Sequence, residues 1–200
     1  MHNLATEHWG QVRIQSFGSP TKGQGDGVAV LFGQPESEPR PLVRVHSRCV
    51  YGEVFRSLDC DCLGQYEKAL DMIAREGHGI VIYLEQEGRG CGLQKKAAAY
   101  ELAQTDKVDT VEAYRQLNLP SDMRHYGHVV AVLREIGVSR IRLLTNNPRK
   151  IAELLDSGLE VQRVPLRVSP NEWNMAYLKA KQVKLGHDLG LALGDQGDPE

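Results

Sequence analysis

The sequence predicts an α/β fold in which a single layered domain holds a mixed sheet flanked by helices. Short apolar runs typical of strands dominate the first third of the chain, and helical periodicity begins near Leu63. Strands and helices are then interspersed up to residue 185, which indicates one shared core. With 200 residues, 41% of them hydrophobic, the chain is long and apolar enough to bury such a core.

Each expected strand is a short apolar or alternating run next to turn-forming residues. The run Gly79–Leu84 is continuously apolar, which is typical of a strand buried on both faces. Segments 18–27 and 33–41 are rich in glycine and proline, and we expect turns and a solvated loop there. The expected strands are Val12–Ile14, Val28–Phe32, Leu42–His46, Gly79–Leu84, Arg140–Leu144 and Glu160–Val164.

The expected helices show apolar residues three and four positions apart. The first begins at Leu63 and ends at Glu76-Gly77, with Leu70 and Ile73 on its apolar face. In a later one, Thr145–Asn147 supply a cap before a proline, Gly158 closes the helix, and Ile151, Leu154 and Leu155 face the core. Further helices are expected over Leu93–Gln104, Asp109–Asn118, Val129–Ile136 and residues 171–185.

Composition narrows the class of protein. The net charge of −2 gives no general attraction to nucleic acid or to an acidic membrane, so any bound anion needs a local basic cluster. The N-terminus lacks the pattern of a signal peptide, and no apolar run is long enough to span a bilayer. We expect a cytoplasmic protein with one catalytic domain, residues 1–185, and a flexible tail, residues 186–200.

Three of the four cysteines, Cys49, Cys60 and Cys62, lie within fourteen positions. Disulfides are rare in a reducing cytoplasm, so clustered thiols indicate a metal or chemistry. Three thiolates with no nearby fourth protein ligand are typical of a catalytic zinc site that keeps one position for water. The alternative is that they are small buried hydrophobic residues. Cys91 stands alone in a glycine turn and is expected to pack.

Two segments suggest anion binding. Arg44, His46 and Arg48 alternate along a strand that leads to Cys49, so their side chains share a face. This face holds phosphate or is the charged face of an edge strand. In the turn 86–90 the glycines permit close backbone approach, an arginine can grip phosphate, and a carboxylate can accept from the N–H groups of guanine. A plain tight turn is the alternative.

Two later segments are open to a functional and a structural interpretation. Asp122 and Arg124 are expected at the start of a helix, where capping and the helix dipole alone favour an aspartate. Residues 145–150, with Thr145 and Lys150, lie where a strand ends and a helix begins, and such helix N-termini bind phosphate. Capping explains Thr145 and Asn147 equally well.

Taken in order, these segments resemble the GTP cyclohydrolase II family. Single pieces are common, but their order and spacing match over residues 42–185. The matching pieces are RVHS followed by Cys49, SLDCDC, Gln65, QEGRGCGL, Tyr100 in AAAYEL, DTVEAY, the Asp122-x-Arg124 pair and LLTNNPRK.

The resemblance implies zinc on Cys49, Cys60 and Cys62, magnesium with the triphosphate of GTP, and a homodimer. The implied reaction opens the guanine ring at C8, releases formate and pyrophosphate, leaves a diaminopyrimidine ribosyl phosphate and begins riboflavin synthesis. Asp122 matches the position described as proton acceptor, and Arg124 the one described as nucleophile toward the α-phosphate. The implied GTP contacts are Arg44, His46, Ser47, Gln65, Glu87, Gly88, Arg89, Tyr100, Thr110, Thr145 and Lys150.

Arginine keeps its proton in nearly all settings, so Arg124 can equally act by stabilising charge on a transferring phosphoryl group. Several positions depart from the family pattern, and four of the changes alter the charge of the side chain. Arg48 replaces a glutamate, Asp59 an arginine, Lys95 an asparagine and His125 an aspartate. A diverged enzyme that keeps the formyl group or uses another nucleotide is therefore an alternative. A non-catalytic, zinc-containing nucleotide-binding protein and a structural zinc domain are others.

Overall fold

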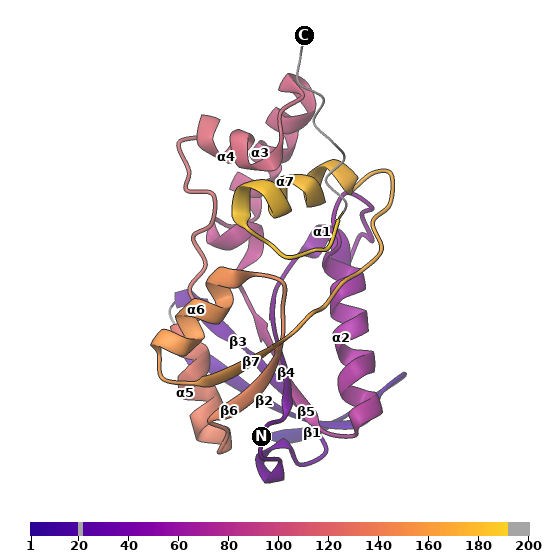
Figure 1. Ribbon diagram of the computed structural model, residues 1–200, viewed down its shortest axis with the longest axis vertical. Coiled ribbons are helices and arrows are strands. Elements are labelled where there is room, and N and C mark those ends of the chain that lie inside the picture. The colour runs from indigo at the N-terminus through magenta and orange to yellow at the C-terminus, as the bar shows by residue number, and fades with distance from the viewer. Residues whose placement is uncertain (20–21, 192–200) are drawn as a thin grey trace.

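The chain forms a mixed sheet covered by helices, as seen in a computed structural model that describes residues 1–19 and 22–191 (Figure 1). In this part of the chain the sheet has seven strands in the order β1-β2-β3-β5-β4-β6-β7, which confirms the α/β class. The strands are β1 (His2–Thr6), β2 (Gly10–Ser19), β3 (Lys22–Phe32), β4 (Leu42–Ser47), β5 (Gly79–Leu84), β6 (Arg140–Leu144) and β7 (Glu160–Val164).

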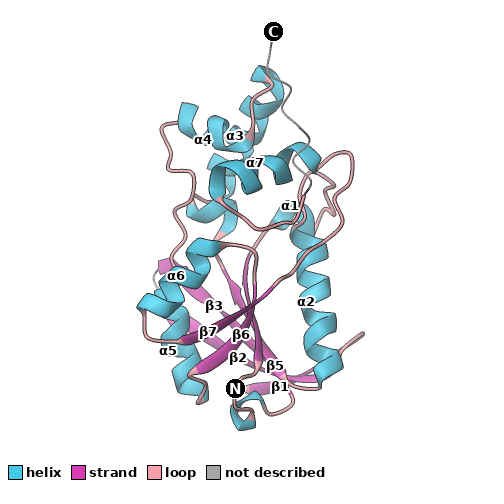
Figure 2. Cartoon of the chain, in the orientation of Figure 1, coloured by secondary structure: helices cyan, strands magenta, loops and turns pink. Residues whose placement is uncertain are grey.

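Helices cover both faces of the sheet and one of its edges (Figures 1 and 2). Helix α2 lies on one side, α5 and α6 lie on the other, and α3, α4 and α7 gather at one end of the molecule. The helices are η1 (Pro35–Ser37), α1 (Val50–Glu53), α2 (Cys62–Glu76), η2 (Glu87–Gly90), α3 (Leu93–Asp106), α4 (Thr110–Gln116), α5 (Gly127–Ile136), α6 (Pro148–Asp156) and α7 (Met175–Leu185).

The strand pairing in the sheet changes from antiparallel to parallel at β5. Strands β1, β2, β3 and β5 pair antiparallel, whereas β5, β4, β6 and β7 pair parallel. Parallel pairing brings the carboxyl ends of β4, β5 and β6 to one edge. The segments after these strands begin at Arg48, Glu85 and Thr145. Ligands in α/β sheets bind at this edge, and here the helices α3, α4 and α7 stand over it.

Apolar side chains fill both faces of the sheet. On one face the α2 residues Leu70 and Ile73 pack against the strands, as their helical spacing predicted. On the other, α5 and α6 pack through residues that include Leu133 and Leu154. The expectation that Leu155 faces the core is wrong, because this side chain is 47% exposed. Successive helical residues turn by about 100°, so burial of Leu154 directs its neighbour outward.

The N-terminal hairpin is longer than its apolar pattern suggested. Segment 18–27, expected to be turns, belongs largely to strands β2 and β3, with Phe17 paired to Gly27 and an irregularity between Phe17 and Ser19. Backbone hydrogen bonds hold an antiparallel strand pair together whatever its side chains are, so the two strands can extend beyond the apolar residues. Strand β1 was not predicted because most of its residues are exposed and carry no buried face.

A third, smaller cluster joins α3 to α4 through Ala99, Ala113 and Tyr114. Cys91 packs against this cluster, as expected, and its thiol donates to the Gly88 carbonyl at 2.7 Å. Helix α4 begins as its sequence predicted, because the Asp109 carboxylate accepts from the backbone N–H groups of the first turn.

The last helix starts later than expected. Residues 171–174 form a closed turn in which the Asn171 side chain accepts from the Trp173 and Asn174 N–H groups, so α7 begins only at Met175. After α7 the chain stays close to the domain, where the Asp188 N–H donates to the Asn146 carbonyl and the Asp188 carboxylate pairs with Arg163. Residues 192–200 of the expected tail lie outside the described residues.

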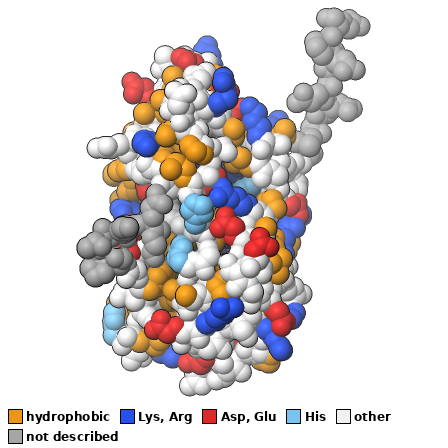
Figure 3. All heavy atoms as spheres, turned by 90° about the vertical axis from the view of Figure 1, so that its left-hand side faces the viewer, with side chains coloured by type: hydrophobic (Ala, Val, Ile, Leu, Met, Phe, Trp, Pro, Cys, Tyr) orange, Lys and Arg blue, Asp and Glu red, His pale blue; other side chains and the backbone are white. Residues whose placement is uncertain are grey.

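Two properties of the described chain bear on its surroundings. Among the described helices, none combines the length and the apolar character needed to cross a membrane. On the face shown in Figure 3, acidic and basic side chains are intermingled with apolar ones, and no large patch carries one sign of charge. This distribution agrees with the small net charge of −2.

Candidate active site

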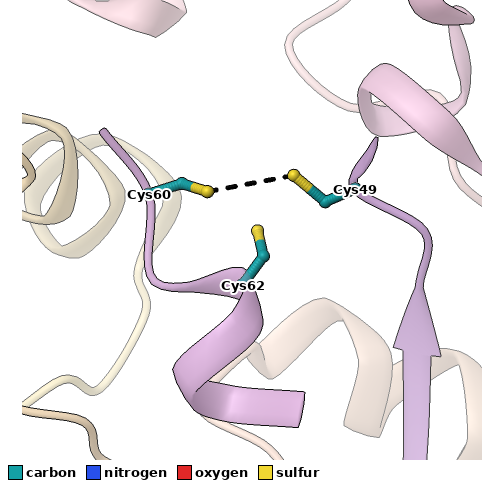
Figure 4. A group of neighbouring side chains, drawn as sticks. All are labelled: Cys49, Cys60 and Cys62. Atoms are coloured by element: carbon teal, nitrogen blue, oxygen red, sulfur yellow. Dashed lines mark hydrogen bonds between the residues drawn. The ribbon is translucent and has the colours of Figure 1, made fainter. Parts of the chain in front are cut away.

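The three clustered cysteines converge on one point (Figure 4). Cys49 follows β4, Cys60 lies in the loop before α2, and Cys62 is the first residue of α2. Their sulfur atoms lie within 4.8 Å of one another, and the Cys49 and Cys60 sulfurs are 3.8 Å apart. Three sulfur donors at this spacing, brought from separate segments, fit a soft divalent ion such as zinc. The metal interpretation is therefore favoured over mere packing.

Lys96 of α3 stands beside this thiol cluster and was not singled out by sequence reasoning. Its ammonium donates to the Cys49 sulfur at 3.2 Å and to Glu87 Oε1 at 2.8 Å. Hydrogen bonds from the Cys60 and Cys62 thiols, assisted by the Lys96 charge, lower the pKa of Cys49. Burial alone would lower the pKa of Lys96, but Glu87 and Cys49 raise it. A thiolate is thus favoured at Cys49, whereas hydrogen bonds with Cys49 raise the pKa of Cys60 and Cys62.

The turn after β5 is built around Glu87. Its carboxylate accepts from Lys96, from the Gly88 N–H and from the Val50 N–H, which ties three segments together. Gly88 and Arg89 both have left-handed backbone conformations, with φ of 60° and 56°. Such a conformation is strained for Arg89 and recurs at functional turns. The Arg89 guanidinium lies 5.2 Å from the centre of the Tyr114 ring.

Arg44 and His46 point from β4 into the same buried region. Arg44 donates to the Leu144 carbonyl at 2.9 Å and to Gln65 Oε1 at 2.8 Å. His46 Nε2 lies 2.8 Å from Glu53 Oε1, yet burial outweighs this partner and lowers the pKa of His46 to about 4. His46 is thus neutral at pH 7, and it adds no positive charge to the face predicted from residues 44, 46 and 48.

Asp61, between two of the cysteines, connects the thiol cluster to the buried cations. It accepts from Lys181 of α7 at 2.8 Å and from the Gln65 amide. Gln65 in turn accepts from Arg44. Burial alone would raise the pKa of Asp61, but Lys181 and these hydrogen bonds lower it. Sequence reasoning missed Asp61 and Lys181, because an isolated acid in a cysteine loop and a lysine in the last helix carry no distinctive spacing.

Asp122 and Arg124 lie in the loop before α5, not at the start of a helix as expected, because α5 begins at Gly127. The Asp122 carboxylate accepts from the Arg124 guanidinium at 2.9 and 2.6 Å and from the Arg124 N–H at 3.0 Å. Burial alone would raise the pKa of Asp122, but the neighbouring Arg124 lowers it. Burial alone would lower the pKa of Arg124, but Tyr126 and Asp122 raise it. Both groups therefore stay ionised.

The start of α6 brings Thr145 and Lys150 to the same region. Asn147 caps the helix by accepting from the Arg149 N–H, and Thr145 accepts from the Asn147 N–H. Lys150 is buried, donates to the Val45 carbonyl at 2.6 Å, and has a pKa far below its usual value. Burial causes most of this shift, and the positive charges of Arg44 and Arg124 add to it.

These groups line one cleft with two adjoining compartments. The first holds the thiol cluster, and the second holds the buried cations. Asp122 is absent from both linings and reaches the cleft only through Arg124. The other predicted site residues line it, namely Arg44, His46, Ser47, Cys49, Cys60, Cys62, Gln65, Glu87, Gly88, Arg89, Tyr100, Thr110, Arg124, Thr145 and Lys150.

The four charge-altering departures from the family pattern fall in different places. Arg48 lines the thiol compartment and pairs with Glu85 at 2.7 Å. Asp59, Lys95 and His125 are exposed and belong to neither compartment. Among the four, Arg48 lines the thiol compartment itself, and Asp59 lines a neighbouring hollow that shares Tyr100, Thr110 and Tyr177 with that compartment.

The fold and the cleft together are those of an α/β enzyme with a candidate thiolate metal centre beside a pocket lined by arginine and lysine side chains. The model of the GTP cyclohydrolase II family matches residues 1–165. The chain therefore belongs to the GTP cyclohydrolase II family, as its motifs indicated.

Individual relatives agree with this assignment. The chain is 46% identical over 180 residues to the GTP cyclohydrolase-2 of Shewanella oneidensis, which covers 90% of this chain and 88% of that protein. It is 48% identical over 181 residues to the riboflavin biosynthesis protein RibBA of Aquifex aeolicus, covering 90% of this chain. The RibBA of Chlorobium phaeovibrioides is 44% identical over 193 residues. The chain spans only 44% and 46% of the length of these two RibBA proteins.

Proposed function

We propose that the protein hydrolyses GTP, opening the imidazole ring at C8 with release of formate and pyrophosphate to give a diaminopyrimidine ribosyl phosphate. This is the first step of riboflavin synthesis. One observation carries the proposal, which is that the thiol and cation compartments adjoin and share five lining residues. The residues shared by their linings are Ser47, Cys62, Arg89, Arg124 and Tyr177. A purine nucleotide can thus present its base to the thiol cluster while its phosphates lie among the cations.

Cys49, Cys60 and Cys62 would hold a zinc ion, and a magnesium ion would accompany the triphosphate. When bound, zinc supplies a Lewis acid close to the reacting carbon of the base. Tyr100, Thr110 and Glu87 line the compartment beside the cysteines and would orient the purine. Glu87 uses about three of its four acceptor sites within the protein, which leaves one for an N–H of guanine.

In the second compartment Arg44, Thr145 and Lys150 would bind the triphosphate, together with Arg89 and Arg124 at the boundary. Ser47, His46, Gln65 and Gly88 would complete these contacts.

For catalysis we assign to Arg124 the stabilisation of charge on the transferring phosphoryl group, rather than nucleophilic attack. Its raised pKa supports this, because a nucleophilic guanidinium would first have to lose its proton. Asp122 would hold Arg124 in position, since its lowered pKa makes it a weak base and both its oxygens accept from Arg124. The expected role of Asp122 as proton acceptor is the alternative.

Further parts of the proposal are a homodimer, a cytoplasmic location and a catalytic domain that ends near residue 185. No contact with nucleic acid or membrane is proposed. The exposed positions of Lys95 and His125 favour the ordinary reaction over a diverged one, because those two substitutions line neither compartment.

The test is to incubate zinc-loaded protein with GTP and magnesium and to quantify formate, pyrophosphate and the mass of the nucleotide product. All three products in equal amounts are expected. A product that retains the formyl group would replace the proposal with the diverged enzyme. Tight GTP binding without any product would identify a non-catalytic nucleotide-binding protein. The Arg124→Gln variant serves as the control for contaminating activity.

A further inference from the structure

The last helix and the residues after it form one wall of the cation compartment. Tyr177, Lys181 and Leu185 of α7 and the following His187 line it, opposite Arg44 and Lys150. In Figure 1, α7 lies across the end of the molecule to which the carboxyl ends of the parallel strands point. The match to the family model ends at residue 165, so this wall lies outside the matched part of the chain.

An ion pair holds the Lys181 side chain in this wall. Its side chain is only 12% exposed and pairs with the Asp61 carboxylate, which is 4% exposed, at 2.8 Å. Burial alone would lower the pKa of Lys181, but Asp61 raises it, so the ammonium stays charged. The Gln65 amide, which binds both Asp61 and Arg44, continues this chain of contacts into the compartment.

The compartment carries more positive than negative charge. Among the cations that line it, Arg124 and Lys181 are paired with Asp122 and Asp61. No described carboxylate pairs with Arg44 or with Lys150, whose charged form is disfavoured by burial. Buried like charges of this kind need a counter-ion. Arg44 Nε is a buried donor for which the described residues offer no acceptor, which points to the same deficit.

The protonation state of His187 also depends on burial and on these nearby positive charges. Burial lowers its pKa to about 3, and the charges of Lys181, Arg124 and Lys150 add to the effect. Its imidazole is therefore neutral and keeps one N–H to donate. His187 is positioned by the backbone, where its N–H donates to the Lys181 carbonyl at 3.2 Å.

We propose that Lys181 and His187 bind the polyphosphate of the substrate, so that the C-terminal segment completes the anion site begun by Arg44 and Lys150. The proposal deepens the proposed function and rests on it for the identity of the ligand. The binding of phosphate at this site does not depend on the proposed function, because the site would recognise any linear polyphosphate of matching length.

The experiment measures binding of inorganic tripolyphosphate in excess magnesium by calorimetry, together with guanosine as a ligand without phosphate. The variants are His187→Gln and the double variant D61N/K181M, which removes the buried ion pair as a whole and so avoids an unpaired carboxylate. Lys179→Met is the matched control, because Lys179 lies on the same helix but is exposed. Metal content and the far-UV spectrum verify that each variant is folded.

We expect tripolyphosphate binding to weaken about ten-fold or more in each test variant, the usual effect of losing a hydrogen bond to a charged group, with guanosine binding and the Lys179→Met control unchanged. For GTP turnover, KM should rise more than kcat falls. Unchanged tripolyphosphate binding in folded His187→Gln, or none in the unaltered protein, overturns the proposal. If the unaltered protein binds tripolyphosphate, the variants lose it and GTP is not hydrolysed, the anion site stands and the proposed function fails.

Discussion

Arg48 and Glu85 form an ion pair at the entrance of the thiol compartment, with Arg48 Nη1 2.7 Å from Glu85 Oε2. The two residues directly follow the neighbouring parallel strands β4 and β5, and both side chains are partly exposed, at 44% and 42%. Arg48 is the departure from the family pattern that reaches the cleft. Because Glu85 neutralises it, the substitution changes the charge beside the cysteines far less than the sequence alone suggested.

Because of this ion pair, we expect Arg48→Glu to reduce stability and activity only while Glu85 is present. Two adjacent carboxylates should reduce stability by up to about 1 kcal/mol, since the pair is partly exposed. The double variant R48E/E85R should restore both stability and the KM for GTP. Urea unfolding and steady-state kinetics on the two single variants and the double variant measure this coupling. Equal defects in R48E and in the double variant would show that the charge at position 48 itself matters.

Metal binding should depend on Cys60 and not on Cys91. Cys60→Ser removes one of three sulfur donors, so the bound zinc should fall well below one per chain and turnover by roughly a hundred-fold or more. Cys91→Ser is the matched control, because a serine hydroxyl can donate to the Gly88 carbonyl as the thiol does. Elemental analysis of both proteins gives the answer. Full zinc occupancy in Cys60→Ser would contradict the proposed metal centre.

Asp122 and Arg124 should act as one unit. Arg124→Gln removes a charge stabiliser and should lower kcat by roughly a hundred-fold to a thousand-fold. Asp122→Asn frees the guanidinium and should cause a loss of similar size. The double variant D122N/R124Q should be no more than about three-fold worse than either single variant, because both changes disable the same interaction. Multiplying losses would instead support a separate role for Asp122 as proton acceptor.

Lys96 and Glu87 form a buried pair, with side chains 7% and 11% exposed. Lys96→Met leaves the Glu87 carboxylate buried without a counter-ion and should reduce the free energy of unfolding by about 3–5 kcal/mol. The double variant K96M/E87Q should recover most of this loss, which urea unfolding of the zinc-loaded proteins measures. A double variant that is as unstable as K96M would show that Lys96 acts mainly through Cys49, 3.2 Å away.

His46 should remain neutral well below the pH at which an ordinary imidazole titrates, because burial lowers its pKa to about 4. Between pH 6.5 and 4 the unfolded chain takes up a proton at this residue and the folded chain does not. Stability from this source is present above pH 6.5 and is lost as the pH falls toward 4. The ring carbon signal of His46, identified by its absence in His46→Gln, should not shift from pH 8 to 5.5. A midpoint near 6.5 would contradict this.

Much of the fold and of the site was predictable because local signals are strong where burial is strong. The continuous apolar run of β5 and the periodic face of α2 each report a buried surface, and both elements appear where expected. The start of α6 at Asn147-Pro148 depends only on residues adjacent in the chain, so it could be predicted equally well. Likewise, close spacing in the chain marked the cysteine cluster before the structure showed the three sulfurs together.

The tertiary structure decided what depends on contacts between distant segments. Lys181 meets Asp61 across 120 positions of the chain, and Lys96 meets Cys49 across 47, so no local pattern announces either contact. The neutral state of His46 likewise follows from burial, which a sequence does not state. The sequence by itself determined the residue types of the thiol cluster and the order of the elements. Which charges face which was settled by the folding of β4, α2, α3 and α7 around one cleft, because electrostatic interactions act through space and not along the chain.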